Sequence, residues 1–174
     1  RLQGGEGHPP QEAVARGLTN IRDLVTTWDP HPTFFEIATA LALLHFWNAS
    51  LDLLILETGM GGRLDSTNAI QSTVTVLTPI DYDHQKWLGD TLQEIAGEKA
   101  GIIKAGIPVV SAVQPAEAAA VIGAQAAELG SSLRFVASPM MRFPLPFLRA
   151  PQTQNSPQSI AAFHPPHGSL PGHP

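Results

Sequence analysis

The chain has 174 residues, enough for one domain with a substantial hydrophobic core. Its net charge of −5 and its lack of a basic stripe argue against a nucleic-acid-binding surface. The sequence contains no cysteine, which excludes disulfide bonds and thiolate metal sites and is compatible with a cytoplasmic protein. No apolar stretch is long enough to cross a bilayer, so we expect no membrane association. We also expect a cytoplasmic protein that is a monomer.

The first predicted element is a helix over residues 13–27, preceded by a Gly- and Pro-rich lead-in at residues 1–12 that we expect to be flexible. Thr33 and Glu36 form a T-x-x-E capping box, which predicts a second helix over residues 34–48. This second helix is apolar on nearly every side, so we expect it to be buried between layers.

Short apolar runs alternate with helical patterns along the rest of the chain. Strands are predicted over residues 51–56, 73–80, 108–113 and 133–137, and helices over residues 91–104 and 116–129. This alternation predicts a three-layer α/β domain over residues 13–138, with a mostly parallel sheet and helices on both faces. Nine prolines fall within residues 139–174, so we expect no long regular element in that segment.

Two candidate metal ligands follow the first two predicted strands. Glu57 comes directly after the run at residues 51–56, and His84 follows the run at residues 73–80. In open parallel sheets, ligands bind beyond the carboxyl ends of the strands. If the two strands are neighbours, about 4.8 Å apart, both side chains could reach one ion. Alternatively, Glu57 caps the loop and His84 hydrogen-bonds the backbone; the residues alone leave both possibilities open.

Lys99 lies in an apolar stripe of the helix predicted over residues 91–104. Its neighbours three and four positions away are Ile95, Ala96, Ile102 and Ile103. Burial there would lower the pKa of the amine, and a neutral amine can react with carbon dioxide to give a carbamate, an anionic oxygen ligand. Alternatively, the side chain extends along the stripe until its charge reaches water, and the spacing alone favours this interpretation.

Residues 59–68 form a glycine-rich loop that also carries Arg63, Asp65, Ser66 and Asn68. Glycines alone are a weak signal because any tight turn uses them, and the crowded polar side chains favour a ligand contact only modestly. The sequence contains no phosphate-binding G-x-x-x-x-G-K-[ST] loop.

Taken together, these motifs resemble the folylpolyglutamate synthase and dihydrofolate synthase family, within the Mur ligase superfamily. The matching blocks are Pro-Thr-Phe-Phe-Glu (32–36), Leu-Glu-Thr-Gly-Met-Gly-Gly-Arg-Leu-Asp-Ser-Thr-Asn (56–68), Asp83-His84, Leu-Gly-Asp-Thr-Leu (88–92) and Glu-Lys-Ala-Gly-Ile-Ile-Lys (98–104). They occur in the family's order and near its spacing, over roughly residues 12–137.

The resemblance implies an ATP-dependent ligase that adds L-glutamate to dihydropteroate, tetrahydrofolate or a related folate through an acyl phosphate. It implies that Glu57 and His84 bind Mg²⁺ and that Lys99 is the carbamylated, catalytic lysine. It also implies that residues 33–36 and 64–66 line the pterin site and that Asn155 contacts ATP. The implied pterin-site residues are Thr33, Phe34, Phe35, Glu36, Leu64, Asp65 and Ser66.

Several departures from the family accompany these matches. The family's phosphate loop would lie before Arg1, and Arg149 and Pro151 replace a glycine and a histidine close to Asn155. We therefore expect an incomplete central domain without its phosphate-loop strand, a degenerate segment over residues 139–174, and negligible activity of the chain alone.

Two alternatives remain open. One is a fragment of a cell-wall ligase of the same superfamily, against which the residues at 33–36 and 64–66 argue. The other is a non-catalytic remnant that binds at most folate-like ligands. The sequence leaves open whether the parent protein makes dihydrofolate, extends polyglutamate tails or does both.

Overall fold

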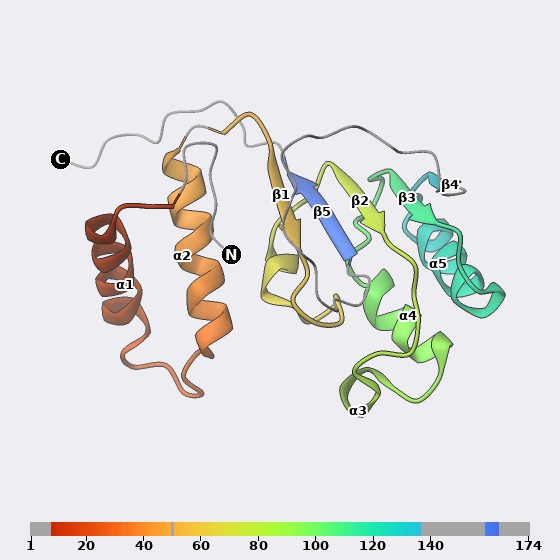
Figure 1. The fold of residues 1–174 in the computed structure, drawn as a ribbon, viewed down its shortest axis with the longest axis horizontal. Coiled ribbons are helices and arrows are strands. Elements are labelled where there is room, and N and C mark those ends of the chain that lie inside the picture. The colour runs from red at the N-terminus through yellow and green to blue at the C-terminus, as the bar shows by residue number, and fades with distance from the viewer. Residues whose placement is uncertain (1–7, 50, 137–158, 164–174) are drawn as a thin grey trace. The chain divides into compact units, whose positions relative to one another are not determined.

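Figure 1 shows the computed structural model, which describes residues 8–49 and 51–136 in full and the backbone of residues 159–163. By their contacts the residues divide into two compact units. The first comprises residues 1–54 and 164–174, and the second comprises residues 55–163. Each unit is therefore described by itself.

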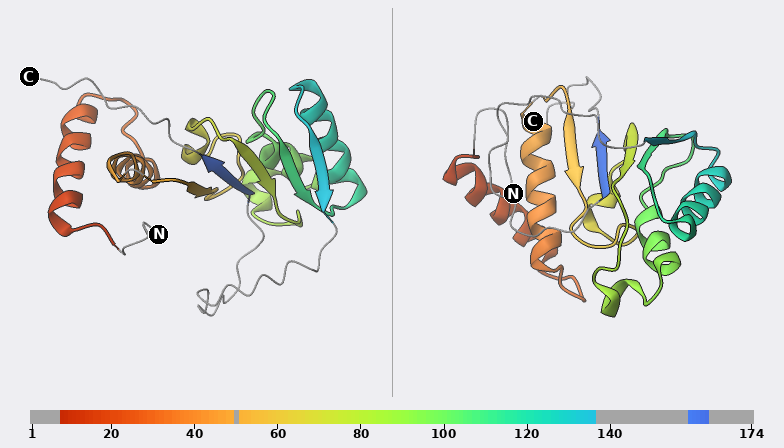
Figure 2. Two further views of the ribbon diagram at one scale, coloured as in Figure 1. Left: turned by 90° about the horizontal axis from the view of Figure 1, so that it is seen from above. Right: turned by 45° about the vertical axis from the view of Figure 1, so that its right-hand side comes forward.

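The first unit contains a pair of helices, α1 (Gln11–Val25) and α2 (Phe34–Asn48), which pack against each other (Figures 1 and 2). The predicted capping box of α2 is confirmed: Thr33 Oγ1 accepts a hydrogen bond from the Glu36 backbone, and the Glu36 carboxylate accepts one from the Thr33 backbone. The expected burial of α2 on all sides is wrong for the described residues. Of the α2 side chains only Leu41 is buried, because α1 covers one side of the helix and leaves Phe34 86% exposed.

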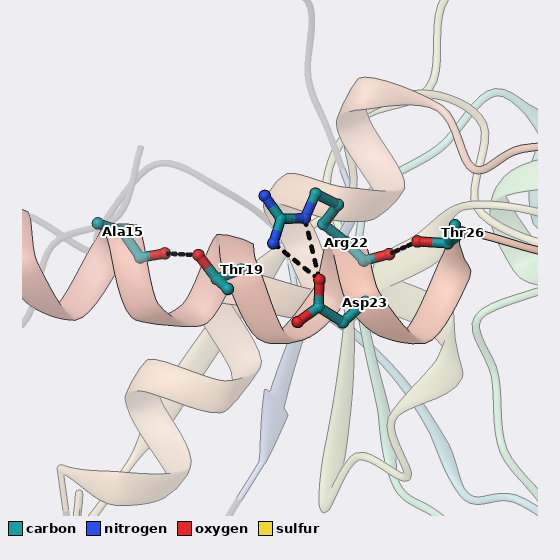
Figure 3. Close-up of polar contacts among 5 residues, drawn as sticks. All are labelled: Ala15, Thr19, Arg22, Asp23 and Thr26. Carbon is teal, nitrogen blue, oxygen red and sulfur yellow. Dashed lines mark hydrogen bonds and ion pairs between the residues drawn. The ribbon is translucent and has the colours of Figure 1, made fainter.

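Figure 3 shows local polar contacts along α1 and at its C-terminal end. Thr19 Oγ1 donates to the Ala15 carbonyl at 3.0 Å, and Thr26 Oγ1 donates to the Arg22 carbonyl at 2.6 Å. Arg22 also pairs with the adjacent, exposed Asp23 at 2.8 Å. These contacts stabilise α1 locally and assemble no group with catalytic chemistry.

The second unit is built on a five-stranded sheet in the order β1-β5-β2-β3-β4 (Figure 1). The strands are β1 (Leu54–Glu57), β2 (Val74–Leu77), β3 (Val109–Ala112), β4 (Leu133–Val136) and β5 (Ser159–Phe163). The predicted mostly parallel α/β sheet is confirmed, since β2 pairs in parallel with β3, and β3 with β4. β5, a short strand that no local sequence pattern predicted, runs antiparallel to β2.

Two helices, α4 (Leu92–Ala100) and α5 (Ala116–Glu128), share one hydrophobic core with the central strands. The buried core side chains are Leu77, Ile80, Leu88, Ile95, Ala96, Ala100, Ile102, Ile103, Val109, Ala118, Ile122 and Ala126. The short α3 (Gln85–Leu88) precedes α4, and a 3₁₀ helix, η1 (Ser66–Ala69), follows the glycine-rich loop.

The helix predicted over residues 91–104 ends earlier, at Ala100, and the next residues form tight turns. The Ile103 backbone N–H donates to the Ala100 carbonyl at 2.9 Å, a tight turn that still buries Ile102 and Ile103. Among the helices of the described residues, none has the length and apolar character needed to span a bilayer.

Candidate functional site

The glycine-rich loop after β1 is organised by the carboxylate of Asp65. One oxygen, Oδ2, accepts hydrogen bonds from the backbone of Gly59 at 2.9 Å and of Met60 at 3.0 Å. The other, Oδ1, accepts from the backbone of Thr67 at 2.9 Å and from its hydroxyl at 2.6 Å. The sequence predicted a substrate contact at Asp65, and the structure shows its carboxylate turned toward the loop's own backbone.

The same loop is docked on the C-terminal half of α4. The Arg63 backbone N–H donates to the Glu98 carbonyl at 2.8 Å, and the Arg63 guanidinium pairs with the Glu98 carboxylate at 2.8 Å. A Cβ at Gly62 would lie 2.7 Å from the Glu98 carbonyl oxygen, and a Cβ at Gly101 would collide with Arg63. Glycine is therefore required where the loop meets the helix.

Asn68 forms a second attachment between loop and helix. Its Nδ2 donates to the carbonyls of Arg63 at 3.0 Å and Gly101 at 3.1 Å. Its own carbonyl accepts from Lys104 Nζ at 2.8 Å, and burial lowers the pKa of Lys104. Residues 98, 101 and 104 are thus all held by the loop, on both sides of Lys99.

Lys99 lies inside this framework with only 6% of its surface exposed. Most of its side chain is therefore covered by protein. Loss of hydration lowers the pKa of the Lys99 amine, and the negative charge of Asp83 acts in the opposite direction. The structure thus brings a buried amine under the electrostatic influence of the segment that follows β2.

His84 lies in that segment, beside Asp83 and at the start of α3. Its backbone is left-handed, with φ of 49°, and its Nε2 lies 3.6 Å from Asp83 Oδ2. The strands that precede Glu57 and His84 are not neighbours, because β5 lies between β1 and β2, so the condition under which adjacent strands would bring both side chains to one ion is not met. β2 also ends at Leu77, so six residues lie between its end and His84.

The remaining predicted residues lie in different parts of the chain. Glu57 is the exposed last residue of β1 and leads into the loop. Within the described residues, no group of three or more His, Cys, Asp or Glu side chains is arranged to hold a metal ion. Residues 33–36 belong to the first unit, where the capping box engages Thr33 and Glu36, and its hydrogen bonds lower the pKa of Glu36. Asn155 lies outside the described residues.

Sequence reasoning missed the docking roles of Arg63 and Asn68 and the influence of Asp83 on Lys99. Arg63 and Glu98 are 35 positions apart, so no local pattern pairs them. The available signal was the spacing of glycines, because Gly62 and Gly101 mark where two backbones approach closely.

Known proteins match this chain both in sequence and in structure. A Bacillus subtilis dihydrofolate synthase/folylpolyglutamate synthase is 56% identical over 92 residues, which are 52% of this chain and 21% of the relative. The apo form of Lacticaseibacillus casei folylpolyglutamate synthase superposes with a TM-score of 0.66 at 39% identity, covering 73% of this chain and 32% of that chain. The matched part of the chain is similar to folylpolyglutamate synthases in sequence and in fold.

A solved folylpolyglutamate synthase complex with AMPPCP and folate also matches, with a TM-score of 0.65 and 43% identity. It covers 71% of this chain and 30% of that chain. No family model matches the chain. The resemblance to folylpolyglutamate synthases and the α/β fold it implied are confirmed, and the chain spans between 21% and 32% of the length of these relatives.

Proposed function

We propose that this chain is part of an ATP-dependent ligase that adds L-glutamate to dihydropteroate or to a folate through an acyl phosphate. The homology supports the reaction class, and the matching complex contains the ATP analogue AMPPCP together with folate. The observation that carries the proposal is the buried amine of Lys99. Lys99 lies on α4, to which the glycine-rich loop is bonded, and the negative charge of Asp83 acts on its amine.

The chemistry of Lys99 follows from its burial. Because its pKa is lowered, more of the amine is neutral at a given pH than for an exposed lysine. The neutral nitrogen attacks the carbon of carbon dioxide and loses one proton, which leaves an anionic carbamate on Nζ. Burial in an apolar stripe thus favours the neutral amine, which is the form that reacts with carbon dioxide, over the charged ammonium.

A carbamate on Lys99 would be negatively charged and would therefore attract a magnesium ion. An anion on buried Lys99, close to the negative charge of Asp83, needs a compensating cation. Glu57, His84 and the carbamate on Lys99 would hold Mg²⁺, whose role is to neutralise negative charge on the transferred phosphoryl group. Glu57 and the carbamate would supply the oxygen ligands that this ion prefers, and His84 the nitrogen.

Substrate contacts are proposed at two segments and one further residue. Residues 33–36 and 64–66 would line the pterin site, where Leu64, 79% exposed, offers an apolar surface to a planar ring. Asn155 would contact ATP. The phosphate-binding loop that such ligases use is not in this sequence, so we expect the chain by itself to add glutamate at a negligible rate.

A chimera tests the proposed function. Residues 32–112 of this chain would replace the homologous segment of the Bacillus subtilis relative, and ATP-dependent addition of radiolabelled glutamate to dihydropteroate and to tetrahydrofolate would be measured. We expect activity with at least one of these substrates. Lys99→Arg, which keeps a cation but cannot form a carbamate, should lower the rate about a hundredfold or more.

Lys86→Arg is the matched control for this experiment, because Lys86 is exposed and should tolerate the change. A folded chimera that adds no glutamate would contradict the proposed function. A Lys99→Arg chimera as active as the parental chimera would contradict the role of Lys99.

A further inference from the structure

The carboxylate of Asp65 has its hydrogen-bonding capacity filled by the loop that contains it. A carboxylate offers about four acceptor sites. The backbone of Gly59 and Met60 occupies Oδ2, and the backbone and hydroxyl of Thr67 occupy Oδ1, at distances of 2.6 to 3.0 Å. A ligand that bonded to this carboxylate would have to displace a donor of the loop.

These bonds set the course of the loop toward α4. Asp65 ties the start of the loop at Gly59 to the beginning of η1 at Thr67, and the residues between are thereby held in a closed turn. Arg63, inside this turn, bonds Glu98, and Asn68, just after it, bonds Gly101.

We propose that Asp65 is a positioning residue. Its carboxylate holds residues 59–67 in the conformation that docks the loop on the C-terminal half of α4, which carries Lys99, and that presents Leu64 to the substrate. Leu64 precedes Asp65 and is 79% exposed, although the backbone on both sides of it is fixed. The inference rests on the proposed function for the identity of the substrate, whereas its structural part is tested without any ligand.

Amide hydrogen exchange of the isolated chain, resolved by residue in NMR, measures the structural part. In Asp65→Asn, the side-chain NH₂ replaces one carboxylate oxygen and faces backbone N–H groups, which cannot accept its hydrogen bonds. The amide exchange rates of Gly59, Met60 and Thr67 should therefore rise about tenfold or more. In Asp65→Ser the short hydroxyl can still reach the Thr67 amide, so the acceleration should be concentrated at Gly59 and Met60. Asp90→Asn is the matched control, because Asp90 is exposed and outside the loop.

A ligand readout separates positioning from a purely structural role. Isothermal titration with dihydropteroate should show about tenfold or more weaker binding to both Asp65 variants, and unchanged binding to Asp90→Asn. Faster exchange with unchanged dihydropteroate binding would overturn the positioning role. Unchanged exchange at Gly59, Met60 and Thr67 would overturn the proposal outright.

Two further outcomes are also decisive. Global unfolding of both Asp65 variants, seen as lost protection at Val109 and Ile122 in the core, would contradict a role confined to the loop. Absence of dihydropteroate binding by the wild-type chain would remove the substrate site that Asp65 is proposed to position. That result would count against the proposed function, whereas the exchange result would still decide how the loop is held.

Discussion

The loop after β1 contacts α4, and the segment after β2 leads into α4. One proposed metal ligand, Glu57, directly precedes the loop and another, His84, lies in the segment, yet the two are held differently. The loop at residues 59–68 is fixed by Asp65 internally and by Arg63 and Asn68 against the helix. The segment after β2 leaves Tyr82 54% and Trp87 69% exposed. The Gln114 side chain bonds it at Thr78 and Ile80, and the capping box of α4 holds its end. The first segment therefore supports the helix that carries Lys99, and the second carries exposed aromatic side chains together with Asp83, whose charge acts on Lys99.

The largest expected effect tests the close contact between loop and helix. Gly62→Ala would place a Cβ 2.7 Å from the Glu98 carbonyl, and we expect it to lower the free energy of unfolding by roughly 1–3 kcal/mol. Gly97→Ala is the matched control, because nothing lies within 4 Å of its Cβ position on α4. The control should raise stability by about 0.5–1 kcal/mol. Urea denaturation checks both, and equal effects would contradict the tight docking.

Lys99 provides the second prediction, which concerns pH. Its folded-state pKa is lowered by burial, so the unfolded chain binds more protons at pH values between the folded and unfolded pKa, and stability should rise with pH over that interval. Lys99→Met should raise the free energy of unfolding by roughly 1 kcal/mol at pH 7 and reduce this alkaline rise. Urea denaturation across a pH series in carbon-dioxide-free buffer measures both effects.

Lys86→Met is the control for this pH series, since Lys86 is exposed. Lys104, whose pKa burial also lowers, should maintain part of the alkaline rise in the Lys99→Met variant. A profile that Lys99→Met leaves unchanged would show that the amine is hydrated in solution.

The anchor of the second segment gives the third prediction. Thr91 Oγ1 accepts from the Glu94 backbone, and Thr91→Ala should lower the free energy of unfolding by about 1 kcal/mol. Hydrogen bonds from Thr91 also lower the pKa of the Glu94 carboxyl in the folded state. The stabilisation from these carboxylate bonds is therefore fully present above the pKa of an ordinary carboxyl, and it is lost as pH falls through the lowered pKa of Glu94. The acid limb of a thermal-stability profile should flatten in the variant.

Thr33→Ala is the same change on α2 and serves as the comparison. It removes a cap from the first unit, so amide exchange should rise at the start of α2 while the β2–β3 core keeps its protection. If either variant lowered amide protection in both units, the expectation that each cap stabilises only its own unit would be contradicted.

The smallest expected effect concerns the partly exposed ion pair between Arg63 of the loop and Glu98 of α4. The Arg63 side chain is 56% exposed and that of Glu98 26%, so their ion pair should contribute about 0.5 kcal/mol, less at high salt. A double-mutant cycle with Arg63→Gln and Glu98→Gln measures the coupling. A coupling of several kcal/mol would mean that the side chains, rather than the backbone and glycines, hold the loop.

The elements that sequence predicted well depend on local patterns. Capping boxes at Thr33 and Thr91 fix where α2 and α4 begin because their bonds join residues three positions apart. The burial of Lys99 was foreseen only as one of two possibilities, because spacing cannot show whether a long side chain reaches the edge of its stripe.

What sequence did not reveal depends on contacts between distant residues. β5 lies between β1 and β2, two strands whose adjacency the sequence left open. The docking of Arg63 on Glu98 and the engagement of Asp65 by its own loop likewise require the folded backbone. Glycines at positions 62 and 101 were visible, but only the structure shows that each faces another chain segment.

The most direct test is to titrate the isotopically labelled chain with Mn²⁺ in bicarbonate buffer and follow paramagnetic broadening in NMR. The account predicts early and selective broadening of the Glu57 carboxyl, the His84 imidazole and the Lys99 Cε signals, with a new carbamate signal that Lys99→Arg abolishes. Exposed acids such as Asp23 and Asp90 should broaden only at much higher Mn²⁺ concentration. If Glu57, His84 and Lys99 broaden no earlier than those acids, the three groups do not share a cation and the account is contradicted.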